Sequence, residues 1–133
     1  MSGAEVSTGH RVVRAFLAGD APAMVDLLTP DATFHSPVTD YPGRESVSKV
    51  LTALVQVLTE PKLTRILDGP GETAAFFTVP DLQGHPAEGV LLVLADQDTP
   101  ATDVTLMIRP LKTLLLGIER MKQLLRYDQP SSP

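Results

Sequence analysis

The chain has 133 residues, a length that suits one domain around one hydrophobic core. Acidic residues outnumber basic ones 16 to 11 and no lysine–arginine cluster is present, so we expect neither nucleic acid nor an anionic membrane as a partner. The absence of cysteine excludes disulfides, thiol catalysis and cysteine-bound metal.

The N-terminal third predicts two helices followed by a strand. Apolar residues at helical spacing indicate a first helix over about residues 7–18, with Gly19 as its left-handed cap. Asp20 then caps a short second helix, which Pro30 stops. Alternation in ATFHS predicts a strand, and YPG predicts a turn.

The clearest amphipathic pattern predicts a third helix between Gly43 and Pro61. Its apolar residues recur at i, i+3, i+4, i+7, i+8 and i+11, which places them on one helix face. These residues are Val47, Val50, Leu51, Leu54, Val55 and Leu58.

Four strands and a last helix are predicted for the remainder. The strand segments are LTRILD, TAAFFTVPDL, EGVLLVLAD and DVTLMIR, and Pro110 starts the helix. Residues 127–133 are expected to be a frayed tail. Helices followed by a run of strands predict an α+β fold, whose antiparallel sheet must bury one face against helices. We expect a single domain over 1–133, with a core of about 6–125.

This element order, with the segments FLAGDAPAMVDLLTPDATFHSPV and YPGRESVSKVL, resembles the nuclear transport factor 2-like superfamily and, more narrowly, its SnoaL-like branch. Uncharacterised bacterial members with FHSPV and a late RPL are similar. The resemblance implies a cystatin-like, cone-shaped fold: a curved mixed or antiparallel sheet wrapped around the N-terminal helices, plus a C-terminal helix. It also implies a homodimer through the sheet's outer face and a mostly apolar pocket. The expected pocket residues are Val12, Phe16, Phe34, Ser36, Tyr41 and Leu91.

The acids used by enzymes of this superfamily are missing from the matching positions. A ketosteroid isomerase-like enzyme needs a carboxylate base and two oxyanion donors, which the resemblance places at Ser36, Val12 and Leu91. Epoxide hydrolase-like chemistry needs two carboxylates and an arginine, but the late acid falls near Arg109. Asp103 lies on the same strand, about 20 Å from Arg109, too far to share a substrate atom. A SnoaL-like cyclase would lack its acid at Leu91.

Three polar side chains remain as catalytic candidates. His35 could act as a general base near pH 7, although strand alternation favours a ring that faces outward. Tyr41 could donate a hydrogen bond at the pocket mouth or pack within the turn. A buried arginine must be paired, and Arg109 could clamp a carboxylate ligand, face a dimer partner, or pair with Glu88 across strands. Structural pairing is favoured because the resemblance places the late arginine in the RPL turn.

We expect no metal and no cofactor. His35 and His85 lack the spacing of metal ligands, and His10 is near the N-terminus. The first residues show no signal-peptide pattern, and the apolar runs are too short to span a bilayer, so the expected location is the cytoplasm.

Three functions are compatible with these residues. The missing acids favour a protein that binds a small apolar molecule in the cone pocket. An isomerase, polyketide cyclase or epoxide hydrolase-type enzyme would need a rearranged set, with His35, Tyr41 and Arg109 converging within about 3 Å of one ligand atom. A protein-interaction module would instead show an exposed apolar patch beyond the dimer face.

Overall fold

The structure is a computed structural model that describes residues 6–128. Helices precede and follow a run of strands, so the predicted α+β class is confirmed. The elements in chain order are α1 (Thr8–Leu17), α2 (Ala21–Asp26), β1 (Leu28–His35), β2 (Asp40–Pro42), α3 (Arg44–Val57), β3 (Lys62–Gly69), β4 (Glu72–Leu82), β5 (His85–Leu94), β6 (Ala101–Arg109) and α4 (Leu111–Asp128).

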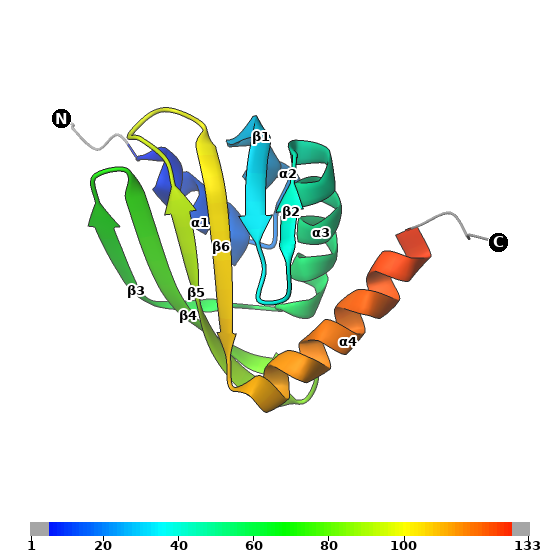
Figure 1. Cartoon of the computed structure of the whole chain (residues 1–133). Helices are drawn as coiled ribbons and strands as arrows, with labels where there is room; N and C mark the ends of the chain where they lie inside the picture. The colour runs from blue at the N-terminus through cyan, green and yellow to red at the C-terminus, as the bar shows by residue number, and fades with distance from the viewer. Residues whose placement is uncertain (1–5, 129–133) are drawn as a thin grey trace.

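The strands form one mixed sheet with the order β2-β1-β6-β5-β4-β3 (Figure 1). Neighbouring strands are antiparallel except β1 and β6, which pair in parallel with Phe34 opposite Val104. The parallel pair needs a long crossover, and the chain between β1 and β6 contains α3 and the β3–β5 meander. The last strand therefore lies in the middle of the sheet, beside the first.

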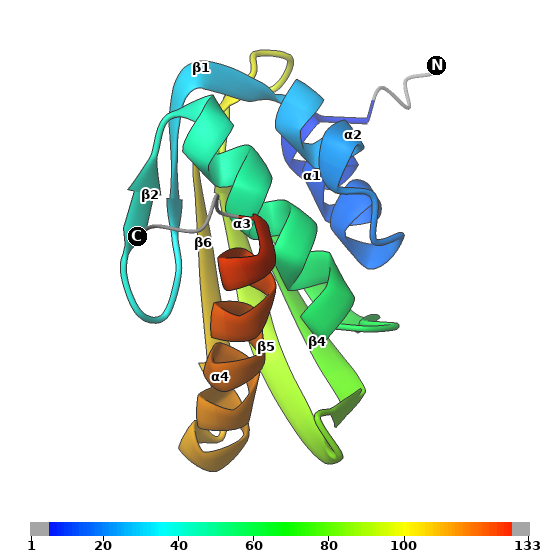
Figure 2. The same cartoon turned by 90° about the vertical axis from the view of Figure 1, so that its right-hand side faces the viewer.

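All four helices of the described chain lie on one face of the curved sheet (Figure 2). Along β4, Ala75, Phe77 and Val79 are buried beneath the helices, whereas the alternating Phe76 and Thr78 face the other side. Phe77 meets Phe16 of α1 edge to face, with ring centroids 4.9 Å apart. The core thus lies between the helices and the sheet, and no element within residues 6–128 covers the outer sheet face.

The predicted end of the first helix and the predicted start of the second are confirmed, whereas Pro30 does not stop the second helix, because α2 ends at Asp26 and Pro30 lies within β1. Gly19 follows α1 with φ +68°, the left-handed conformation that glycine adopts without strain. Asp20 caps α2, because its carboxylate accepts a hydrogen bond of 3.1 Å from the backbone N–H of Ala23. These two signals turn the chain so that α1 and α2 pack against each other.

Three boundaries differ from the predictions. β1 starts at Leu28, four residues before ATFHS, because the buried Leu28 pairs with Ala101 of β6. β2 pairs with β1 where YPG predicted only a turn. α4 continues to Asp128, so Tyr127 and Asp128 are helical, and residues 129–133 of the predicted tail lie outside the described residues.

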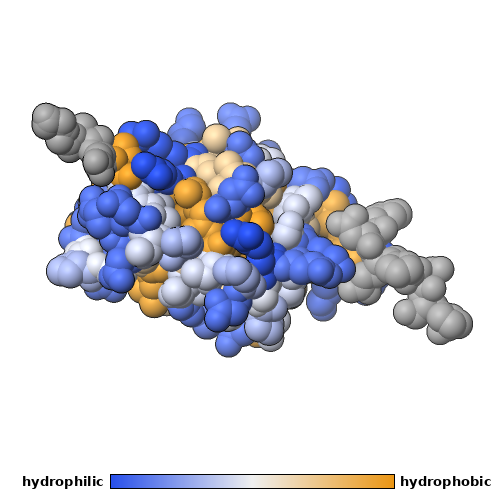
Figure 3. All heavy atoms as spheres, turned by 90° about the horizontal axis from the view of Figure 1, so that it is seen from above, coloured by the Kyte–Doolittle hydropathy of each residue, from blue (hydrophilic) through white to orange (hydrophobic). Residues whose placement is uncertain are grey.

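Apolar side chains also reach the surface in places. Figure 3 shows hydrophobic patches between hydrophilic residues on the face viewed from above. Among the most exposed large apolar side chains are Met107, at 59% on the outer face of β6, and Leu111, at 67% at the start of α4. Single exposed apolar side chains are normal, and only a contiguous exposed apolar patch marks a candidate interaction surface.

Candidate functional site

An apolar cavity of about 170 Å³ lies between α3, α4 and the hairpin formed by β1 and β2. Figure 2 shows α3 and α4 packed side by side next to this hairpin. The hairpin contributes Phe34, Val38 and Tyr41, and α4 contributes Leu114 and Met121 among others. The wall residues from α3 belong to its buried face and are Val50, Leu54 and Val57.

Few polar groups of the lining are available to a ligand. The Ser36 hydroxyl donates to the Thr39 carbonyl at 2.8 Å and accepts from the backbone N–H groups of Val38 and Thr39 at 3.1 and 3.0 Å. The hydrogen-bonding capacity of the Ser36 hydroxyl is therefore used within its own turn and is not available to a ligand. Tyr41, whose ring stacks on Phe34, and Lys122 of α4 are the polar side chains that remain in the lining.

The six predicted pocket residues divide into two groups. Phe34, Ser36 and Tyr41 line the cavity. Val12, Phe16 and Leu91 lie instead in the packed core and are at most 2% exposed. The physical reason is that α1 packs directly on β4 and β5, where Phe16 and Phe77 interlock and fill the space. The hollow is thus displaced from α1 toward α4.

The rearranged catalytic set is not brought together. His35 faces outward, as strand alternation predicted, whereas Tyr41 packs against the core on the inner side. Arg109 lies four residues beyond Thr105, the residue opposite His35, which corresponds to about 13 Å along the strand. These three side chains therefore cannot contact one ligand atom.

Arg109 is paired as predicted, but it is not buried. Its guanidinium donates to the Glu88 carboxylate directly across β5 and β6. The arginine side chain is 74% exposed, so the expectation of a buried arginine is wrong. The cause is its position at the end of β6, on the uncovered outer face of the sheet. An ion pair this exposed ties two strand ends together and contributes little free energy.

His35 bridges two carboxylates on the outer sheet face. Its Nδ1 lies 2.8 Å from Asp40 Oδ1 of β2, and its Nε2 lies 2.8 Å from Asp103 Oδ2 of β6. The hydrogen bonds to Asp103 and then to Asp40 raise the pKa of His35 above its ordinary value, and partial burial opposes them. The same contact with His35 lowers the pKa of Asp103. Sequence analysis identified His35 but not these two partners.

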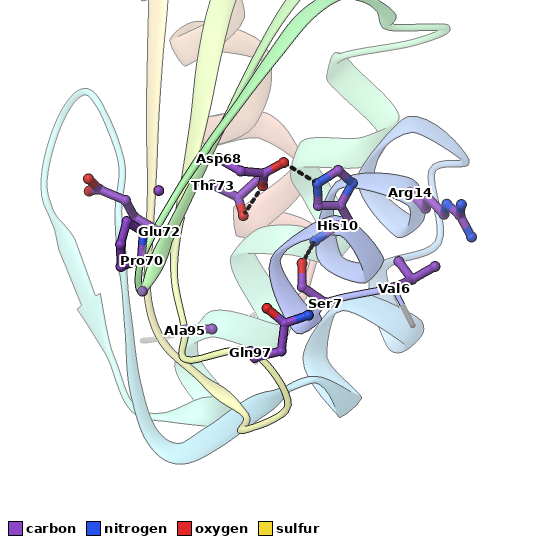
Figure 4. A pocket seen from close by; sticks show the side chains of 12 residues that line it. Val6, Ser7, His10, Arg14, Asp68, Pro70, Glu72, Thr73, Ala95 and Gln97 are labelled. Carbon is purple, nitrogen blue, oxygen red and sulfur yellow. Dashed lines mark hydrogen bonds and ion pairs between the residues drawn. The ribbon is translucent and has the colours of Figure 1, made fainter. Parts of the chain in front are cut away.

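A second cavity, of about 580 Å³ and open to solvent, lies where the start of α1 meets β3 and β4 (Figure 4). We call it the polar cavity because a cluster of polar side chains, including His10, Asp68 and Thr73, lines it. His10 Nε2 donates to Asp68 Oδ2 at 2.7 Å, and Thr73 Oγ1 donates to Asp68 Oδ1 at 3.0 Å. The hydrogen bond from His10 lowers the pKa of Asp68. With its Nε2–H directed at an ionised carboxylate, the neutral imidazole keeps Nδ1 as a proton acceptor.

Sequence analysis set His10 aside because it is near the N-terminus. The structure places it in the first turn of α1, beside Asp68 of β3, which is 58 residues later in the chain. No local pattern signals this pairing, because it depends on how α1 packs across the sheet. An isolated histidine at the start of an amphipathic helix was the one available hint.

Within residues 6–128, no three histidine or acidic side chains are arranged to hold a metal ion. None of the helices in the described part of the chain could span a bilayer.

Three solved structures show the class of protein to which this fold belongs. An uncharacterised protein with a cystatin-like fold from Silicibacter pomeroyi is 26% identical, with a TM-score of 0.79, over 87% of this chain and 83% of that chain. A steroid delta-isomerase from Pseudomonas aeruginosa is 24% identical, with a TM-score of 0.79, over 96% and 98% of the two chains. An NTF2-like protein of unknown function from Cytophaga hutchinsonii is 13% identical, with a TM-score of 0.65, over 86% and 99%. The architecture is the cystatin-like, nuclear transport factor 2-like fold.

The chain belongs to the SnoaL-like domain family, whose model matches residues 10–102. No curated protein matches the chain significantly. The likeness to the steroid delta-isomerase shows a shared fold only, because the identity is low. The matched range ends before α4, so the helix that closes the apolar cavity lies outside it.

Proposed function

We propose that the protein binds a small, mostly apolar molecule in the cavity between α3, α4 and the β1–β2 hairpin. The observation that carries the proposal is a lining of aliphatic and aromatic side chains interrupted by two usable polar groups. Small-molecule sites usually combine such an apolar wall with a few polar groups that orient the ligand. The resemblance places a carboxylate base at Ser36 and two oxyanion donors at Val12 and Leu91, and the lack of such groups there favours binding over the acid–base reactions of the superfamily.

The volume and the polar groups narrow the class of ligand. An apolar cavity of about 150 Å³ can hold benzene, and this cavity measures about 170 Å³. Tyr41 can donate a hydrogen bond, and Lys122 carries a positive charge. The proposed ligand is therefore a single ring or a short branched chain that carries one carbonyl or carboxylate oxygen.

A thermal-shift panel of benzoate, hexanoate and cyclohexanone tests this proposal, because a ligand that binds only the folded chain raises the melting temperature. Met121→Trp should abolish the shift by filling the cavity from α4. Glu119→Trp, an exposed position on the same helix that does not line the cavity, should retain it. Equal shifts in both variants, or no shift with any compound, would contradict the proposed site.

The polar groups have a separate test. Tyr41→Phe removes the hydroxyl but keeps the ring that stacks on Phe34. Lys122→Gln removes the charge, and Lys112→Gln, on the same helix outside the lining, is the matched control. Calorimetry measures the affinity for each ligand. Lys122→Gln should lower the affinity for benzoate more than the affinity for cyclohexanone, whereas Lys112→Gln should change neither affinity. An identical loss for both ligands would argue against a carboxylate contact.

A second candidate function is proton transfer at the polar cavity, favoured by the His10–Asp68–Thr73 arrangement. His10 Nδ1 would take a proton from water while Asp68 holds the imidazolium, and the resulting hydroxide would attack the carbonyl carbon of an activated ester. The acyl–oxygen bond would then break, and the aryloxide would leave as the carboxylic acid product forms. Hydrolysis of 4-nitrophenyl acetate by the wild type and by His10→Gln tests this chemistry. A rate that is equal in the two proteins would remove the candidate.

We also propose that the protein forms a homodimer through the outer face of the sheet. Val90, Leu92 and Met107 remain partly exposed there in a single chain. A second copy would remove this apolar surface from water. Light scattering at micromolar concentration should report twice the 14.3 kDa mass of one chain; a mass of one chain would contradict the proposal.

A further inference from the structure

The hairpin that forms one wall of the apolar cavity is held by few interactions. β2 spans only Asp40–Pro42 and is an edge strand that pairs with β1 alone in the sheet. Backbone hydrogen bonds join Ser36 to Thr39 at 3.0 Å and Gly43 to Ala32 at 2.8 Å. A three-residue edge strand contributes little pairing free energy, so side-chain contacts at its ends matter for its position.

His35 supplies such contacts on the outer side of the hairpin. It reaches Asp40 at the first residue of β2 and Asp103 on the neighbouring β6. The imidazole therefore ties the edge strand and the middle of the sheet to the same residue of β1. Ser36, Val38 and Tyr41 of the cavity wall are in or beside the short loop that His35 and Asp40 bracket.

The two contacts require a particular protonation state. A carboxylate above pH 5 accepts hydrogen bonds only, and a neutral imidazole has a single N–H. Both carboxylates can receive a hydrogen bond from His35 only when the ring carries two protons. When the ring loses a proton, one of its nitrogens can no longer donate a hydrogen bond. That nitrogen and the carboxylate oxygen facing it are then both acceptors, and the contact is lost.

The ionisable groups around the ring come from two elements. Asp40 faces it from β2 and Asp103 from β6, and both favour the protonated ring. The opposite residue on β6, Thr105, is neutral. Within the described residues these two carboxylates are the acidic groups within ion-pair distance of His35. Their hydrogen bonds raise the pKa of His35 above its ordinary value, so the doubly protonated ring persists to a higher pH than in a free imidazole.

We propose that His35 is a pH-dependent clasp on the wall of the apolar cavity: the protonated ring fixes the β1–β2 hairpin, and the neutral ring releases it. This inference rests on the proposed ligand site and adds its regulation. A fixed wall is preorganised and binds an apolar molecule more tightly. Binding should therefore weaken as the pH rises, with no titratable group needed on the ligand.

Fluorobenzene, a neutral ring that fits the cavity volume, is a suitable probe, and fluorine NMR measures its dissociation constant. Between pH 6 and pH 8.5 the constant should rise about two- to fivefold in the wild type, the size expected for one partly exposed charged contact. His35→Gln should abolish the change, and Asp103→Asn should reduce it. His85→Gln, at an exposed histidine that does not line the cavity, should retain it.

Hydrogen exchange of the ligand-free protein tests the clasp independently of binding. Protection factors of the Ser36 and Gly43 amides should fall between pH 6 and pH 8.5, whereas the Ala95 amide, bonded to the Gly71 carbonyl at 3.0 Å, should stay constant. Light scattering at both pH values measures the oligomeric state. If that state is the same at the two pH values, a difference in hydrogen exchange comes from the hairpin.

The two readouts separate the failure of the clasp from the failure of the ligand site. If fluorobenzene binds equally at both pH values and the Ser36 and Gly43 protection is unchanged, the clasp is overturned while the ligand site stands. If fluorobenzene does not bind at any pH, the ligand site fails, and the exchange experiment alone supports or overturns the pH-dependent hairpin.

Discussion

Gly89 occupies a position in β5 where a side chain has no room. A Cβ atom there would collide with the backbone carbonyl oxygen of Met107 and come within 2.8 Å of side-chain atoms of Ile108 and Phe77. The carbonyl belongs to the paired strand β6 and cannot move without breaking the sheet register. The glycine therefore permits the close approach of β5 and β6.

Gly89→Ala should destabilise the protein by about 1–3 kcal/mol, because overpacking forces the strands apart. Gly69→Ala is the matched control, since its added methyl group would meet only the Glu72 side chain at an ordinary 3.5 Å. Urea unfolding measures both. Equal midpoints for Gly89→Ala and the wild type would show that the sheet adjusts without cost.

His35 gives a pH-dependent contribution to stability whose sign follows from its raised pKa. A raised folded-state pKa stabilises the fold fully below the ordinary value near 6.5 and loses that stabilisation as the pH rises through the raised value. We expect the wild type to lose up to about 1 kcal/mol relative to His35→Gln between pH 6 and 8.5, since the ring is partly exposed. Parallel pH profiles of unfolding free energy in the two proteins would refute this.

At the scale of secondary structure, α3 is the central helix. It contacts α2, α4 and β1, and its buried face includes Val50 and Leu51. Its N-terminal residue Arg44, which charge and position would place at the surface, is half-buried and donates to the Leu28 carbonyl at 2.5 Å. This contact ties the start of α3 to the start of β1.

Leu51→Ala should therefore cost about 2–5 kcal/mol, as expected for a fully buried leucine. Lys49→Ala, an exposed position on the same helix, should change stability by less than about 0.5 kcal/mol. Chemical unfolding measures both. A small loss for Leu51→Ala would indicate that α3 packs less tightly than the structure shows.

The helices were predictable to within a few residues because their signals are local. Asp20 caps the helix that follows it, and Gly19 ends the helix before it. The apolar residues of α3 recur every three or four positions, so a short window of sequence reveals the helix. β2 was not predictable, because its three residues are too few to show the alternating pattern of a strand. The first half of β1 was not predictable either, because Leu28 becomes a strand residue only by pairing with Ala101. A short-range sequence pattern cannot reveal which distant segment a strand will pair with.

At the scale of the whole molecule, the helices cover one face of the sheet and leave the other uncovered within the described chain. In the proposed dimer this outer face is the interface. Met107→Lys should shift the protein toward single chains by placing a charge on that face. Leu111→Lys, equally exposed but on α4, should not. Sedimentation velocity over a concentration series measures both, and identical profiles for the two variants would place the interface elsewhere.

The amino-acid sequence by itself determined the α+β class, the four helices and the resemblance to SnoaL-like proteins. These follow from composition, periodicity and motifs, which are properties of neighbouring residues. Only the tertiary structure decided that the hollow lies beneath α4 rather than α1, and that His35 and His10 each find carboxylate partners. The physical reason is that a cavity or an ion pair depends on how distant segments pack, and packing is set by the whole chain at once.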